Sequence, residues 1–143
     1  MKTKSIIFGI AILFFTNATT SKAYSDSNNE NEDFYGFFWR FSADFDFQLS
    51  RITFPLQKIG LNYDYTKIDT VYLSKEEWTY HHFYHWYEDE SYNLIYDNFE
   101  HKLRDTGERV YAKHGNGNGI REFYYFKRIN GLWYLIKIED LST

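Results

Sequence analysis

The stretch IREFYYFKRINGLWYLIKIEDL, residues 120–141, decides the fold of this protein. It contains two runs rich in β-branched and aromatic residues, which are typical of strands. Asn130 and Gly131 separate the runs. This dipeptide is the strongest short signal for a hairpin, because both central positions of a type I′ turn need a positive φ. The stretch therefore predicts an antiparallel hairpin.

The last run of this hairpin is apolar on both faces. Leu132, Tyr134, Ile136 and Ile138 alternate with Trp133, Leu135 and Leu141. Both apolar faces of this strand must then be buried against other parts of the protein or a partner. A homodimer through the face bearing Trp133 and Leu135, or a bent sheet with a deep concave side, would provide it.

A third strand is expected just upstream, in ERVYAKH at 108–114, followed by the glycine-rich loop HGNGNG at 114–119. Phosphate-binding glycine loops lead from a strand into a helix, whereas a strand follows here. The loop is therefore interpreted as a hairpin connection.

An amphipathic helix is predicted near the start of the domain. Its apolar residues are three or four positions apart: Phe34, Phe37, Phe38, Phe41, Phe45 and Leu49. Aspartates and serines at 42–46 predict a break or bend. One helix followed by antiparallel strands is an α+β fold in which the helix covers one sheet face.

Between the helix and the C-terminal strands, shorter elements are expected. RITFPLQ at 51–57 alternates like a strand, and Pro55 indicates an edge strand or the end of one. IDTVYL at 68–73 is a second short strand. SKEEW at 74–78 is a single turn with a capping box formed by Ser74 and Glu77.

Residues 1–23 have the three parts of a signal peptide: Lys2 and Lys4, an apolar run at 6–15, and small residues up to Ala23. The run is too short to cross a bilayer, which needs about 20 residues. Cleavage after Ala23 is predicted, with a retained membrane anchor as the alternative. A flexible polar leader at 24–32 and a single α+β domain at 33–143 follow, in a periplasmic or extracellular protein.

Composition narrows the partners. Cleavage removes three of the 16 basic residues and none of the 20 acidic ones, which leaves a net charge of −7. Such a surface repels phosphate backbones and argues against nucleic acid. The chain has no cysteine, whereas small eukaryotic secreted domains often rely on disulfides, so a bacterial exported protein is expected.

Three stretches carry a resemblance to known proteins. Gly131-Leu132-Trp133, with the alternating residues that follow and the N-terminal helix, resembles the nuclear-transport-factor-two-like (cystatin-like) superfamily. DFQLSRITFPL at 46–56, SKEEW and GLWYLIKIEDLS at 131–142 resemble small secreted Bacteroidetes proteins of unknown function thought to share that fold. The resemblance implies a helix packed on a curved antiparallel sheet in an exported protein, and it supplies no activity or catalytic motif. We expect no cofactor.

The 14 tyrosines and 4 tryptophans favour binding, because these rings combine a large rigid area with a polar tip. We expect a non-catalytic binding protein for a glycan, a peptide or a small apolar molecule. The expected pocket residues are His82, Tyr84 and Trp86 on one face of a strand, with His114 and Tyr124. A protein-docking module and an isomerase- or dehydratase-like enzyme using the cavity of the fold are the alternatives.

The stretch TYHHFYHWYEDE at 79–90 raises the question of a metal site. In a helix, His81 and His85 would share a face with Asp89 and chelate one ion. Its aromatic content favours a strand instead. In a strand the two histidines are about 13 Å apart, at ~3.3 Å per residue, so no metal site is expected.

Overall fold

The structure is a computed structural model that describes residues 31–83, 90–102, 104 and 106–143. This part of the chain contains two short helices and six strands. The helices are α1 (Phe34–Ala43) and α2 (Phe45–Ser50). The strands are β1 (Ile52–Leu61), β2 (Ile68–Leu73), β3 (Ser91–Tyr96), β4 (Glu108–Gly115), β5 (Arg121–Ile129) and β6 (Leu132–Asp140).

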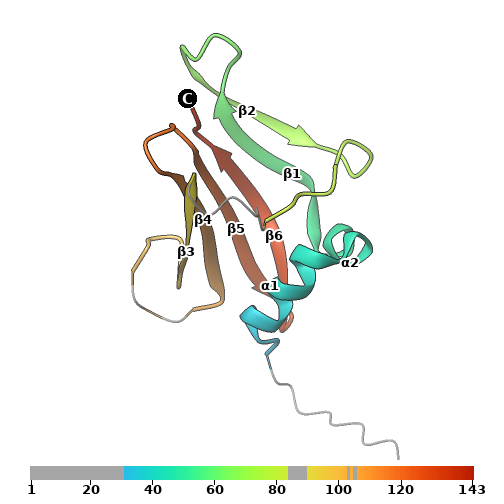
Figure 1. The fold of residues 1–143 in the computed structure, drawn as a ribbon. Helices are drawn as coiled ribbons and strands as arrows, with labels where there is room; N and C mark the ends of the chain where they lie inside the picture. Colours follow the sequence, from blue (N-terminus) through green and yellow to red (C-terminus); the bar gives the residue numbers. More distant parts are fainter. Residues whose placement is uncertain (1–30, 84–89, 103, 105) are drawn as a thin grey trace, which may run out of the picture.

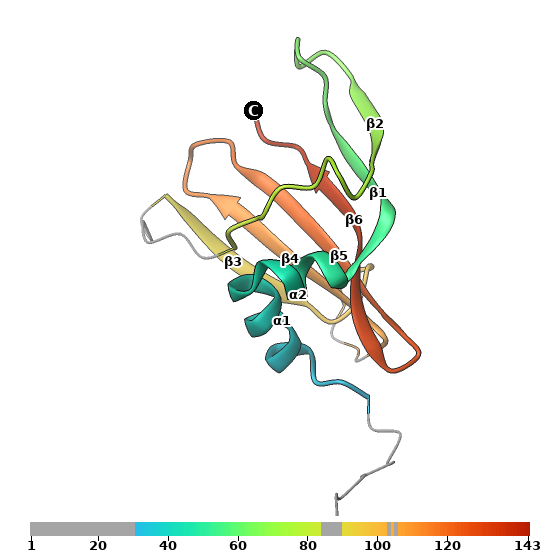
Figure 2. The ribbon, with the colours of Figure 1, turned by 90° about the vertical axis from the view of Figure 1, so that its right-hand side faces the viewer.

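The strands form one curved sheet in the order β2-β1-β6-β5-β4-β3 (Figure 1). Neighbouring strands are antiparallel except β1 and β6, which run parallel, so the last strand returns beside the first. Both helices lie against the same face of the sheet (Figure 2). The predicted α+β fold class is confirmed, with one parallel pair in the sheet.

The helical stripe is broken as its sequence predicts. Asp33 caps α1 by accepting a hydrogen bond from the Gly36 N–H at 2.7 Å. Asp44 ends α1 and caps α2, accepting from the Phe47 N–H at 2.9 Å. This second start rotates the stripe, so Phe45 is left 46% exposed although it was expected in the core.

The main core lies between the helices and the sheet. Phe34, Phe37, Phe38 and Phe41 of α1 are buried against Phe126, Trp133 and Leu135 of the sheet. The rings of Phe34 and Trp133 meet edge to face with centroids 5.1 Å apart. Such aromatic pairs add roughly 0.5–1.5 kcal/mol each beyond their area burial.

The predicted dimer face is wrong, because Trp133 and Leu135 are fully buried beneath the helices. The predicted alternation also fails after Leu135. The register between β5 and β6 shifts by one residue there, a bulge that puts Ile138 on the same face as Trp133. Part of the opposite face is covered by the chain itself, since Phe99 packs on Tyr125 with ring centroids 5.5 Å apart, while Leu132 stays 40% exposed.

The edge-strand prediction is wrong for β1, which lies between β6 and β2. Pro55, which follows a cis peptide bond, is tolerated for a local reason. β2 pairs only with Leu56 to Leu61, and the register with β6 shifts between Ile52 and Gln57. No ladder partner therefore needs an N–H at this position.

Two further expectations change. Residues 79–83 are not a strand but part of a connection that follows the turn at 75–77 and crosses the concave face (Figure 2). Glu32 belongs to the folded domain rather than to a flexible leader. Its carboxylate accepts two hydrogen bonds from Arg51, at 2.8 and 3.1 Å, and one from the Trp133 backbone N–H at 2.8 Å.

Candidate functional site

The candidate site lies on the helix-bearing face of the sheet, beyond the helices. Strand register places Lys58, Ile138 and Tyr124 in one row across β1, β6 and β5. Asp140 faces Gly60 on one side and Glu122 on the other in the next row. This brings charged and hydrogen-bonding groups from three strands to one surface.

Gln48 positions the connection that forms one wall of the site. Its side chain is fully buried and makes four hydrogen bonds. The amide NH₂ donates to the Phe41 and His81 carbonyls, both at 3.0 Å. The amide oxygen accepts from the Trp78 indole N–H at 3.2 Å and from the His81 backbone N–H at 3.0 Å. α2 thereby holds His81 against the sheet.

A chain of three polar side chains follows from this placement. The Tyr124 hydroxyl lies 2.7 Å from Nε2 of His81 and 2.6 Å from Oε2 of Glu122. A carboxylate oxygen accepts, so the Tyr124 hydroxyl donates its hydrogen to Glu122. The hydroxyl oxygen then accepts a hydrogen bond from the Nε2–H of His81, which assigns the Nε2-protonated ring to His81. Burial, followed by the charge of Glu122, raises the pKa of Tyr124, which keeps the phenol protonated as a donor.

These groups border an inner recess of about 200 Å³. Glu77, Trp78 and Thr79 of the crossing connection also line it, together with Lys58 and Asp140 of the sheet. The Nζ of Lys58 is 3.9 Å from Oδ2 of Asp140, and both side chains are about 40% exposed, at 41% and 39%. The ion pair is therefore accessible from solvent.

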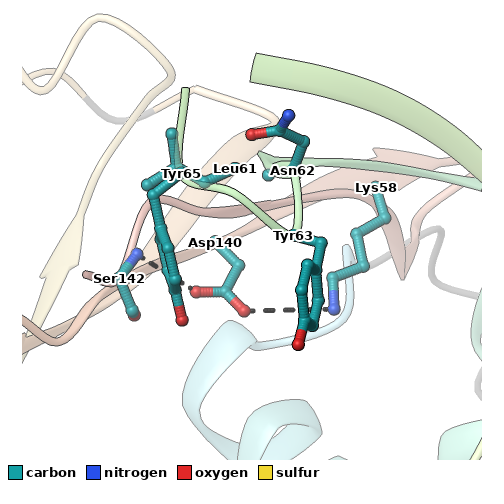
Figure 3. A pocket seen from close by; sticks show the side chains of 8 residues that line it. Lys58, Leu61, Asn62, Tyr63, Tyr65, Asp140 and Ser142 are labelled. Atoms are coloured by element: carbon teal, nitrogen blue, oxygen red, sulfur yellow. Dashed lines mark hydrogen bonds and ion pairs between the residues drawn. The ribbon is translucent and has the colours of Figure 1, made fainter. Parts of the chain in front are cut away.

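An outer cleft of about 550 Å³ begins on the other side of the same ion pair. It is lined by Lys58, Gly60, Leu61, Asn62, Tyr63, Tyr65, Asp140 and Ser142. In Figure 3 the two tyrosine rings extend from the β1–β2 loop toward the end of β6, where Asp140 and Ser142 lie. The backbone N–H of Ser142 donates to Oδ1 of Asp140 at 3.3 Å and orients the carboxylate.

The structure brings only one of the described predicted pocket residues to this site. Tyr124 lies in the recess wall. His82 is exposed and contacts Tyr80, with ring centroids 4.5 Å apart. His114 lies on the opposite face of the sheet, stacked on Tyr92 at 5.3 Å. Tyr84 and Trp86 lie outside the described residues.

Sequence reasoning missed the partners of Tyr124. Glu122 had a local signal, because residues two apart on a strand share a face. His81 had none, since its position depends on Gln48, 33 residues earlier. Tyr63 and Tyr65 had a weak signal as two aromatics in a polar loop.

Among the residues that the structure describes, no three His, Asp or Glu side chains are grouped so that they could hold a metal ion. Within the same residues, no helix has the length and apolarity needed to cross a membrane.

Comparisons with known proteins agree on the fold. An NTF2-like protein from Bacteroides fragilis is 27% identical over 80% of this chain and 49% of its own, with a TM-score of 0.59. The present chain thus spans about half of that protein's length. A cystatin-like protein from Bacteroides caccae is 22% identical over 77% of this chain and 76% of its own, with a TM-score of 0.51.

These structures confirm the nuclear-transport-factor-two-like, cystatin-like fold that the C-terminal hairpin indicated. A comparison with curated proteins found no match. The family pattern of DUF4348, a domain of unknown function, matches residues 13–140. Because this match covers most of the chain, the protein belongs to the DUF4348 family.

Proposed function

We propose that the protein is an exported, non-catalytic binding protein that holds a small polar ligand on the open part of its concave face. One observation carries this proposal: the inner recess and the outer cleft share a solvent-accessible ion pair. Lys58 and Asp140 line both the inner recess and the outer cleft. A ligand that bridges the two hollows would meet both charges.

The chemistry of the walls supports a polar ligand. Lys58 provides an amine donor, and Asp140 and Glu122 provide carboxylate acceptors. These groups come from three adjacent strands, and Gln48 holds the facing connection. The backbone on both sides of the site is thus held in place before a ligand binds, which lowers the ordering cost of binding.

Export is the second part of the proposal. It rests on the basic, apolar and small-residue parts of residues 1–23, which form the pattern of a signal peptide. The strongly acidic net charge that remains after cleavage argues against nucleic acid as the ligand. The protein would then bind its ligand in the periplasm or outside the cell.

Binding can be tested by a thermal-shift screen of the chain lacking residues 1–23 against amino acids, dicarboxylates, nucleosides and oligosaccharides. Hits are then measured by calorimetry. We expect Lys58→Met to weaken binding by at least roughly tenfold, because the ligand loses a charged hydrogen bond worth about 1.5–3 kcal/mol.

Lys67→Met is the matched control. Lys67 also forms an ion pair, with Asp69 at 3.1 Å, but it lines neither hollow. Equal effects of the two substitutions, or a screen without hits, would contradict the proposed site.

A further inference from the structure

The loop at 62–67, between β1 and β2, presents two tyrosines to solvent. Tyr63 is 96% exposed and Tyr65 is 66% exposed. Single exposed aromatic residues are ordinary on protein surfaces. Here two rings from one short loop line the same cleft, beside Asp140 and Ser142 (Figure 3).

The loop is held in a defined conformation. The Asn62 side-chain oxygen accepts hydrogen bonds from the backbone N–H groups of Thr66, at 2.8 Å, and Lys67, at 3.1 Å. The Tyr65 backbone N–H donates to the Asn62 carbonyl at 2.9 Å. The rings therefore extend from an ordered support rather than from a free strand end.

Tyr65 has a φ of 55°. This left-handed conformation suits glycine or asparagine and is uncommon for a bulky residue. Backbone outliers of this kind cluster at binding and active sites. At Tyr65 the outlier carries an aromatic ring that lines a polar cleft.

The cleft is lined by one basic and one acidic side chain, Lys58 and Asp140, whose charges offset each other. A cationic ligand would face Lys58, and an anionic ligand would face Asp140. An apolar ligand would remove water from both groups without giving either a hydrogen-bond partner, which is costly. Adjacent hydroxyl groups, each of which donates and accepts, satisfy the amine and the carboxylate together.

We propose that the outer cleft binds a neutral carbohydrate. The apolar face of a sugar ring stacks on Tyr63 or Tyr65, and neighbouring hydroxyl groups bond to Lys58 and Asp140. The cleft volume of about 550 Å³ is in the range of small-molecule sites and suits a short oligosaccharide. This inference rests on the proposed function and assigns its ligand class.

The test uses the chain lacking residues 1–23 and a set of defined probes. The neutral probes are maltotriose, cellotriose, xylotriose and mannotriose, and the charged probes are trigalacturonic acid and the trimer of glucosamine. Calorimetry gives the affinity, and amide chemical shifts locate the contact. We expect a neutral probe to bind more tightly than the charged ones, with shifts at 58–66 and 140–142.

Three tyrosine variants complete the test. Tyr63→Ala and Tyr65→Asn remove the rings, and asparagine tolerates the left-handed conformation at 65. Tyr72→Ala is the control, because Tyr72 is 63% exposed but lies outside the lining of the cleft. Each cleft variant should weaken sugar binding by roughly tenfold, the scale of one lost stacking contact, and the control should leave it unchanged.

The outcomes separate this inference from the proposed function. If a sugar binds equally well to all three variants, the outer cleft is not its site and the inference is wrong. If no neutral sugar binds at millimolar concentration, the inference is wrong in its ligand class. If a different ligand then binds in a manner lost in Lys58→Met, the proposed function stands without it. If none of the probes or screened molecules binds, both fail.

Discussion

Gln48 determines where the wall of the inner recess lies. A buried amide with two donors and two acceptor positions is satisfied here by two carbonyls, an indole N–H and a backbone N–H. Removing it would leave buried groups without partners, which costs more than the hydrogen bonds themselves contribute. The recess thus depends on a residue that does not line it.

We therefore expect Gln48→Met to destabilise the fold by about 2–4 kcal/mol, since the buried Trp78 N–H and the partly buried His81 N–H lose their acceptor while side-chain length is preserved. Gln57→Met is the control. Gln57 lies half-buried on β1, and its substitution should cost less than about 0.5–1 kcal/mol. Urea unfolding of both variants measures the difference, and equal losses would contradict the role given to Gln48.

The carboxyl group of Glu139 makes the stability of the fold depend on pH. Burial would raise its pKa, but hydrogen bonds from Lys137 and Tyr125, both at 2.7 Å, outweigh this and lower the pKa below its ordinary value of 4.5. A carboxyl whose folded pKa is lowered contributes stability above its unfolded pKa. That contribution is lost as the pH falls through the folded value.

We predict that Glu139→Gln is less stable than the natural protein at pH 7 and that the gap narrows as the pH falls below about 4.5. Chemical unfolding across this range measures the gap. Glu76→Gln, at an exposed glutamate, should show a much smaller change. A gap for Glu139→Gln that stays constant or widens in acid would contradict the assigned hydrogen bonds.

At the scale of elements, the turn between β5 and β6 agrees most closely with its sequence. Asn130 has a φ of 51° and Gly131 a φ of 83°, as a type I′ turn requires. The turn fixes the register in which Leu132 faces Ile129 and Trp133 faces Arg128. Trp133 reaches the core through this register.

Gly131→Ala should destabilise the protein by about 1–2 kcal/mol, the cost of placing a Cβ in the left-handed region. Gly107→Ala is the comparison, because its φ is not positive and its new Cβ would lie 3.6 Å from Cβ of Arg128, an ordinary contact. That change should be close to neutral or slightly stabilising. If thermal unfolding shows that Gly107→Ala destabilises the protein more than Gly131→Ala, the turn does not require a left-handed residue at position 131.

For the whole molecule, the proposal of export makes a prediction independent of the ligand. The secreted product should begin at Tyr24, because Ser21 and Ala23 are the small residues that follow the apolar run. Mass spectrometry of exported protein measures this end. Ala23→Arg should block processing, and a mature product that keeps Met1 would contradict export.

Patterns between neighbouring residues predicted the helical stripe with its break, the three C-terminal strands, the turn at Asn130 and the α+β class. These features depend on backbone preferences and side-chain spacing over a few positions, which any short window of sequence contains. Tyr124 is a candidate on the same local grounds, as an aromatic residue at mid-strand.

Contacts between distant residues decided the rest. The parallel pairing of β1 with β6, the bulge after Leu135 and the crossing of the connection at 79–83 each depend on how separate elements pack. Alternation of apolar and polar residues identifies a strand, but it does not show which strand pairs with it or where a β-bulge interrupts the pairing. His81 and Tyr124 are 43 positions apart, and their hydrogen bond exists because Gln48 and the sheet bring them together. The recess is thus a product of tertiary packing, in which each wall is positioned by residues far away in the chain.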